Sequence, residues 1–161
     1  MVFAIVLLVS VGSGFAGSGP EKLTFPLHRF LIAPLEAPAG QGNQAVMAMY
    51  LAPSQGFAAN INVMVQPWPG TIKNYLAVSE KQFADMGLKV VNKSLPDDHT
   101  AVFEYEGIIK AVSPSTMHWY VRAISRSGKV YLATATATSA QWKTDGSKLK
   151  ACVDSFELAT P

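Results

Sequence analysis

Residues 117–138, MHWYVRAISRSGKVYLATATAT, carry the clearest structural signal in the chain, because they read as two β-strands joined by a tight turn. In the first half, apolar residues at odd-numbered positions alternate with His118, Tyr120 and Arg122. A period of two is typical of a strand with two different faces. The turn is Arg126-Ser127-Gly128-Lys129, and the second half is rich in β-branched residues. Its small Ala and Thr side chains leave room for a helix to pack on one face.

Similar patterns upstream predict further strands. Pro53-Ser54-Gln55-Gly56 and Pro96-Asp97-Asp98-His99 have the composition of turns and separate pairs of apolar or alternating runs. This turn spacing predicts antiparallel neighbours. The additional strands are expected at residues 28–33, 45–52, 58–66, 88–95 and 100–109.

Two helices are expected to cover this sheet. The first runs over residues 72–86, with Thr71 as N-cap and Gly87 after its last turn. The second follows Asp145-Gly146-Ser147, with Ser147 as N-cap and residues 139–144 adding a helical turn before it. The sequence therefore predicts an α+β fold, with an antiparallel sheet of about six to seven strands between two helices, an α/β/α sandwich.

Cys152 is the single cysteine, so the chain as given has no internal disulfide. We expect its thiol to be buried, because it falls on the apolar stripe of the second helix, and a reactive thiol is the less favoured alternative. The other members of that stripe are Leu149, Val153 and Phe156.

The N-terminus resembles an export signal. Residues 2–11, VFAIVLLVSV, have the length of a signal-peptide apolar core and are too short to span a bilayer. Small residues follow, and we expect cleavage after Ala16, although no Lys or Arg precedes the apolar run; a buried N-terminal strand is the alternative. The expected division is a signal segment at 1–16, an arm with the first strand at 17–43, and the domain body at 44–161. We expect no membrane insertion after cleavage, and a periplasmic or secreted location.

Charge and motifs indicate no enzymatic chemistry. A net charge of +2 over 161 residues gives no indication of nucleic-acid binding. No metalloprotease, phosphate-loop, dinucleotide or nucleophile-elbow motif occurs. The Asp97-Asp98-His99 group is interpreted as a solvated turn rather than a cation site. We therefore predict no catalytic residues, no cofactor and no metal.

One pair of carboxylates needs a separate interpretation. Glu104 and Glu106 share one face of a predicted strand, which is expected to face outward. A catalytic carboxylate pair, with His118 as a base, is one reading. We favour an ordinary cross-strand pair with Arg122 on the neighbouring strand.

Trp68 is the candidate partner-binding residue. It lies between Pro67 and Pro69 in a predicted loop, where a rigid exposed aromatic side chain suits docking to another protein. The alternative, which we rate higher, is packing against the start of the following helix.

The local sequences resemble the PsbP-like superfamily and, within it, the bacterial DcrB-type envelope proteins. The matching pieces are GFAANINVMVQPWPGTIKNYLAVSEKQF, AVFEYEG, WYVRAISRSGKVYLATATAT and VDSFEL, within about residues 44–158. The resemblance implies a helix–sheet–helix fold and no enzymatic activity. Many DcrB-type proteins carry a lipid-anchor cysteine, and no cysteine follows the apolar run here.

Together, these observations favour a non-enzymatic exported protein that binds or stabilises another envelope protein. The alternative is a small-molecule or lipid-binding module with a pocket between sheet and helix. A deep apolar pocket would favour the second reading, and an exposed patch near the loops would favour the first.

Overall fold

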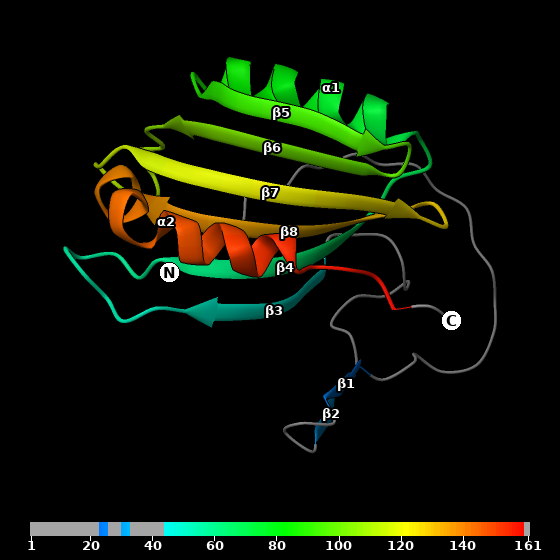
Figure 1. Ribbon diagram of the computed structural model, residues 1–161, viewed down its shortest axis with the longest axis horizontal. Helices are drawn as coiled ribbons and strands as arrows, with labels where there is room; N and C mark the ends of the chain where they lie inside the picture. The colour runs from blue at the N-terminus through cyan, green and yellow to red at the C-terminus, as the bar shows by residue number, and fades with distance from the viewer. Residues whose placement is uncertain (1–22, 26–29, 33–43, 160–161) are drawn as a thin grey trace.

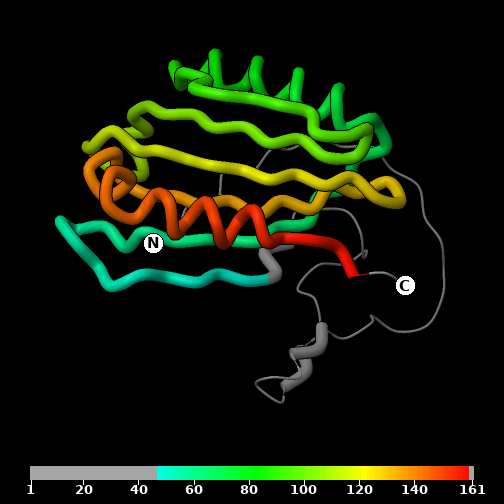
Figure 2. The backbone as a smooth tube through the Cα atoms, in the orientation of Figure 1, coloured from blue at the N-terminus to red at the C-terminus, as the bar shows by residue number. Residues whose placement is uncertain are grey.

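A computed structural model describes residues 23–25, 30–32 and 44–159 of the chain (Figure 1), and Figure 2 shows the path of the backbone through the body in the same orientation. The predicted signal segment, its cleavage point at Ala16 and most of the predicted arm lie outside these residues. Within the arm, β1 (Leu23–Phe25) pairs antiparallel with β2 (Phe30–Ile32). Only β2 was expected, because the short LTF segment of β1 is flanked by Gly, Pro and charged residues that favour a loop.

The body is one six-stranded antiparallel sheet with strand order β3-β4-β8-β7-β6-β5 (Figure 1). Its centre is formed by β8 and β7, the two strands of the segment 117–138, and its edges are β3 and β5. The predicted fold class is confirmed. The strands are β3 (Gln44–Tyr50), β4 (Asn60–Pro67), β5 (Lys89–Asp97), β6 (Thr100–Gly107), β7 (Met117–Arg126) and β8 (Lys129–Thr138).

The two helices lie on opposite faces of this sheet. α1 (Ile72–Asp85) packs against odd-numbered residues of β7, such as Trp119, whereas α2 (Ser139–Asp154) packs against the opposite face, where Tyr120 lies. Figure 1 shows α1 beside β5 and α2 across β8 and β4. Because successive strand residues point to opposite faces, alternation in one strand supplies both layers of the sandwich.

Large aromatic rings fill the layer under α1. The ring of Tyr105 stacks on Phe83 at 4.0 Å and on its cross-strand partner Trp119 at 4.9 Å. Ile72 and Leu76 of α1 are buried against the same cluster. Tyr105 is buried in this layer, and desolvation raises the pKa of its hydroxyl well above the ordinary value of about 10.

Small side chains form the layer under α2. Ala133, Ala135 and Ala137 of β8 are almost completely buried and lie against Leu149 and Val153. The predicted role of the alanine-rich strand as a helix-packing surface is therefore confirmed. α1 also matches its prediction closely: Thr71 is its N-cap, and Gly87 follows it with a positive φ of 72°.

Two predictions about the second helix are wrong. α2 begins at Ser139, and its N-cap is Thr138, which forms a capping box with Gln141; Ser147 is an exposed residue within the helix. The thiol of Cys152 is exposed. Val153 faces the sheet, and successive helical residues are turned by about 100°, so Cys152 points away from the contact.

Candidate functional site

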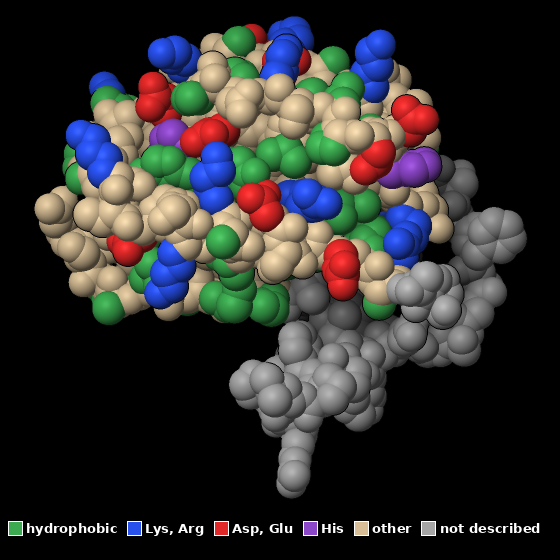
Figure 3. Space-filling view, viewed as in Figure 1, with side chains coloured by type: hydrophobic (Ala, Val, Ile, Leu, Met, Phe, Trp, Pro, Cys, Tyr) green, Lys and Arg blue, Asp and Glu red, His purple; other side chains and the backbone are tan. Residues whose placement is uncertain are grey.

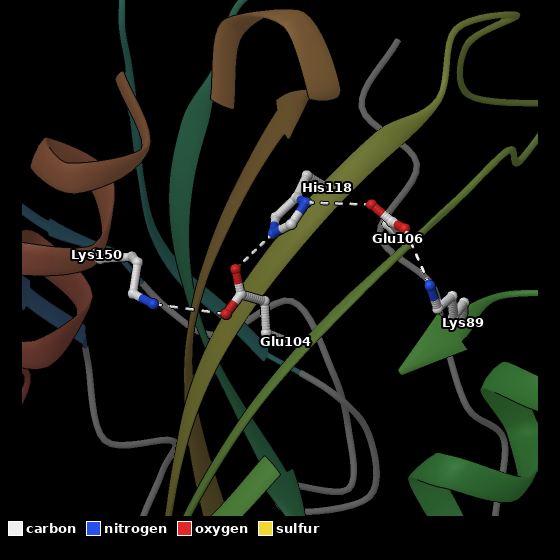
Figure 4. A network of polar contacts seen from close by, with 5 residues as sticks. All are labelled: Lys89, Glu104, Glu106, His118 and Lys150. Atoms are coloured by element: carbon white, nitrogen blue, oxygen red, sulfur yellow. Dashed lines mark hydrogen bonds and ion pairs between the residues drawn. The ribbon is translucent and has the colours of Figure 1, made fainter. Parts of the chain in front are cut away.

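A buried polar network lies on the α2 face of the sheet (Figure 4). The register places Glu106 of β6 opposite His118 of β7, and Glu104 opposite Tyr120. His118 and Glu104 reach diagonally toward each other, with Nε2 of His118 2.7 Å from Oε1 of Glu104. The side chain of His118 is 8% exposed and that of Glu104 is 11% exposed, so water has little access to this contact.

Neighbouring groups surround this contact on both sides. The Nδ1 of His118 is 3.9 Å from a carboxylate oxygen of Glu106, whose other oxygen is 3.9 Å from Nζ of Lys89. The imidazole ring stacks on Trp142 of α2 at 4.2 Å. The Nζ of Lys150 lies 3.5 Å from the second oxygen of Glu104. The network therefore links strands β5, β6 and β7 to α2.

A second polar contact extends this link toward the end of α2. The Tyr120 hydroxyl donates to a carboxylate oxygen of Asp154 at 2.7 Å, and Nζ of Lys150 lies 4.4 Å above the Tyr120 ring. Burial, followed by the hydrogen bond to Asp154, raises the pKa of Tyr120. The hydroxyl therefore stays protonated at neutral pH and works as a donor.

This arrangement corrects the expected cross-strand pair. Glu104 is paired with His118 and Lys150, whereas Arg122 lies opposite Val102 and its Nε has no hydrogen-bond partner among the described residues. Glu104 also faces α2 rather than solvent. Trp142 and Lys150 of α2 cover the His118–Glu104 pair from the helix side, so the pair is part of the helix–sheet contact.

A second candidate region is an open hollow of about 490 Å³ at one end of the sheet. Three connections meet there: the β4–α1 loop, the β5–β6 turn and the β7–β8 turn. Its lining includes Trp68, His99 and Arg126. The backbone N–H of His99 donates to the side chain of Asp97 at 2.7 Å, and this bond lowers the pKa of Asp97. In the part of the chain that the structure describes, no group of three His, Cys, Asp or Glu side chains is placed to hold a metal ion.

Trp68 contributes to this hollow and to the fold. Its backbone N–H donates to the carbonyl of Gly128 at 2.7 Å, and its indole Nε1 donates to the carbonyl of Thr71 at 3.0 Å. Its ring meets the ring of Tyr75 edge-on at 5.2 Å, and a side chain at Gly70 would press against the indole. Trp68 is therefore half-buried, as the packing interpretation predicted, and its remaining surface faces the hollow.

Comparison with known proteins supports the fold. The chain shares its fold with PA94. This protein of unknown function from Pseudomonas aeruginosa has a solved structure that matches with a TM-score of 0.66, covering 89% of this chain and all of that one, at 15% sequence identity. The solution structure of cyanobacterial PsbP (CyanoP) from Synechocystis aligns over 92% of this chain and 98% of that chain, at 15% identity and a TM-score of 0.45. No protein-family model matches the sequence, and no curated protein sequence does either.

The PsbP-like and DcrB-type relationships stay predictions, because a structural match at 15% identity shows the fold alone. None of the described helices is long and apolar enough to cross a membrane. The His118–Glu104 contact was not predicted from the sequence. The two-residue spacing of Glu104 and Glu106 opposite His118 was the available signal, but it does not reveal which face a helix covers.

Proposed function

We propose that this is a non-enzymatic exported protein that binds a protein partner at the loop end of its sheet. The observation that carries the proposal is the hollow where three loops meet around the half-buried ring of Trp68. An aromatic side chain already fixed by its neighbours loses little conformational entropy on docking. Such residues often supply much of the binding free energy in protein interfaces.

The filled layers of the sandwich favour this function over the alternative ligand-binding module. Stacked rings of Phe83, Tyr105 and Trp119 occupy the space under α1, and closely packed alanines occupy the space under α2. A pocket between sheet and helix would need room in one of these layers. The hollow lies instead among surface loops, which is the usual place for recognition residues.

The buried position of the His118–Glu104 pair supports a non-enzymatic role. A general base must reach a proton on its substrate, either directly or through one water molecule. Here the Nε2 of His118 is engaged by Glu104, and its ring is covered by Trp142. The proposal of export rests separately on the apolar residues 2–11 and the small residues after them.

The test is capture of partners from envelope extracts of the native host, using the tagged chain and its Trp68→Ala variant. We expect Trp68→Ala to weaken capture of the main partner about 30-fold or more, as for an interface anchor worth about 2 kcal/mol. Val78→Ala, at an exposed apolar residue of α1, is the matched control and should bind normally.

Circular dichroism and urea unfolding of both variants distinguish lost binding from lost folding. Equal capture by a folded Trp68→Ala chain would contradict the proposed binding site. If that variant unfolds, Trp68→Phe retains a ring but loses the Nε1 donor and allows the same comparison.

A further inference from the structure

The two edges of the sheet differ strongly in how they are protected against pairing with another strand. β5 carries Lys89, Lys93 and Pro96, and its ladder to β6 is interrupted at two places. Lysine, proline and bulges are devices that keep an edge strand from recruiting another chain. β3, with the sequence QAVMAMY, has no charged residue and no proline, and one irregularity near its start.

The ladder between β3 and β4 shows which backbone groups face outward. The N–H of Leu51 donates to the carbonyl of Ala59 at 2.8 Å, and the register continues with Tyr50 opposite Asn60 and Met49 opposite Ile61. Opposed residues in an antiparallel ladder alternate between bonded and non-bonded pairs. The N–H and C=O groups of Tyr50 and Ala48 therefore point away from β4, and among the described residues no strand pairs with them.

The side chains of β3 form an apolar strip beside this edge. The register puts Met47 and Met49 on the same face as Val63 and Ile61, which is the face that α2 covers further along. Met47 and Met49 are 43% and 41% exposed, and Tyr50, on the other face, is 53% exposed. In Figure 3, apolar side chains lie along the rim where Figure 1 places β3, whereas Lys and Arg side chains mark the rim of α1 and β5.

We propose that β3 is a strand-addition site, which takes an extended, uncharged segment of a partner protein with an apolar residue at every second position. The outward donors and acceptors of Ala48 and Tyr50, which no described strand occupies, would bind its backbone, as in other cases of β-augmentation. Its apolar side chains would lie beside Met47 and Met49 and extend the layer under α2. Methionine adapts to differently shaped apolar partners.

The absence of charge on β3 selects an uncharged occupant. A charged residue at an apolar position of the partner would lose hydration beside Met47 and Met49, and β3 offers no opposite charge to compensate. The surface does not include Trp68, so failure of this proposal leaves the proposed function of the loop hollow intact, and the reverse also holds.

The probe is the capped peptide acetyl-Ser-Val-Thr-Val-Ser-Val-Thr-amide, seven residues long like β3. Amide hydrogen exchange of the full chain is followed by NMR with and without this peptide. In the chain alone, the amides of Ala48 and Tyr50 should exchange faster than those of Met47 and Met49, which bond to β4. The peptide should slow exchange at Ala48 and Tyr50 at least tenfold, and the same peptide with lysine in place of valine should not.

Ala48→Pro removes an outward N–H without taking a donor from the β4 ladder, and it should weaken peptide binding at least tenfold, while Ala48→Ser should bind normally. If Ala48→Pro does not fold, Met49→Lys takes its place as the test variant. It adds a charge at an exposed position and should likewise weaken peptide binding at least tenfold. Lack of peptide-dependent protection would overturn the proposal. Slow exchange of the Ala48 and Tyr50 amides in the chain without peptide would also overturn it. If that protection is present at all protein concentrations, upstream residues of the same chain cover the edge. If it appears only at high protein concentration, a second copy of the chain covers the edge.

Discussion

His118 connects the sheet to α2 through contacts that are largely hidden from water. Replacing it by alanine removes the 2.7 Å contact with Glu104 and the stack on Trp142. Among the described residues, the buried carboxylate of Glu104 then keeps only Lys150, at 3.5 Å. We expect His118→Ala to lower the free energy of unfolding by about 3 kcal/mol, measured by urea unfolding.

An exposed ion pair provides the control for this experiment. Lys81 and Asp85 are four residues apart on α1, with side chains 77% and 63% exposed. Lys81→Ala should therefore cost less than about 0.5 kcal/mol. If His118→Ala costs no more than Lys81→Ala, the buried network does not stabilise the fold.

Cys152 provides a second test at the level of a single side chain. Because its thiol is exposed on α2, a thiol reagent should label the native chain as completely as the chain unfolded in urea. Cys152→Ser should remain unlabelled and should unfold at the same urea concentration as the parent chain. Labelling that appears only on unfolding would restore the prediction of a buried thiol.

The capping box of α2 determines where that helix begins. The Thr138 hydroxyl accepts from the backbone N–H of Gln141 at 3.2 Å. Thr138→Ala should lower stability by about 1 kcal/mol in urea unfolding, whereas Thr138→Ser keeps the hydroxyl and should lose less.

Ser147→Ala distinguishes the observed helix start from the predicted one. Ser147 is exposed within α2, where alanine has the higher helix propensity, so the variant should be as stable as the parent or slightly more stable. A loss of about 1 kcal/mol would instead indicate an N-cap at Ser147.

The sequence contained a signal for the observed start of α2. Thr138 followed by Gln141 fits the capping-box pattern, but Asp145-Gly146-Ser147 has stronger turn composition. In the structure, Gly146 lies under the ring of Trp142, where a Cβ atom would be 3.2 Å from the indole. Close packing therefore explains this glycine inside the helix, and that packing partner cannot be identified from turn propensities.

The export proposal concerns the whole chain. Intact-mass analysis of protein from the native host should give a chain that starts near residue 17, because a signal peptidase requires small residues before the cut. Ala16→Arg should block this cleavage and yield the unprocessed mass. A full-length mass for the parent chain would contradict the predicted signal segment.

Most of the sandwich could be predicted because each central strand has two chemically different faces. The alternation of Trp119 with Tyr120 indicated a strand with two different faces, and the small Ala and Thr residues of the next strand indicated room for a helix on one of them. The burial of Glu104 could not be predicted in this way, because it depends on where α2 crosses the sheet. The position of β3 at an edge of the described sheet could not be predicted from the sequence either, because strand order depends on pairings between distant segments.

The three tryptophans of the chain lie in separate environments. Trp68 borders the loop hollow, Trp119 is stacked on Tyr105 under α1, and Trp142 is stacked on His118 under α2. Intrinsic fluorescence can therefore be assigned to one region at a time in variants that keep a single indole. Emission from Trp142 then follows the α2 side of the sheet, and emission from Trp119 follows the α1 side.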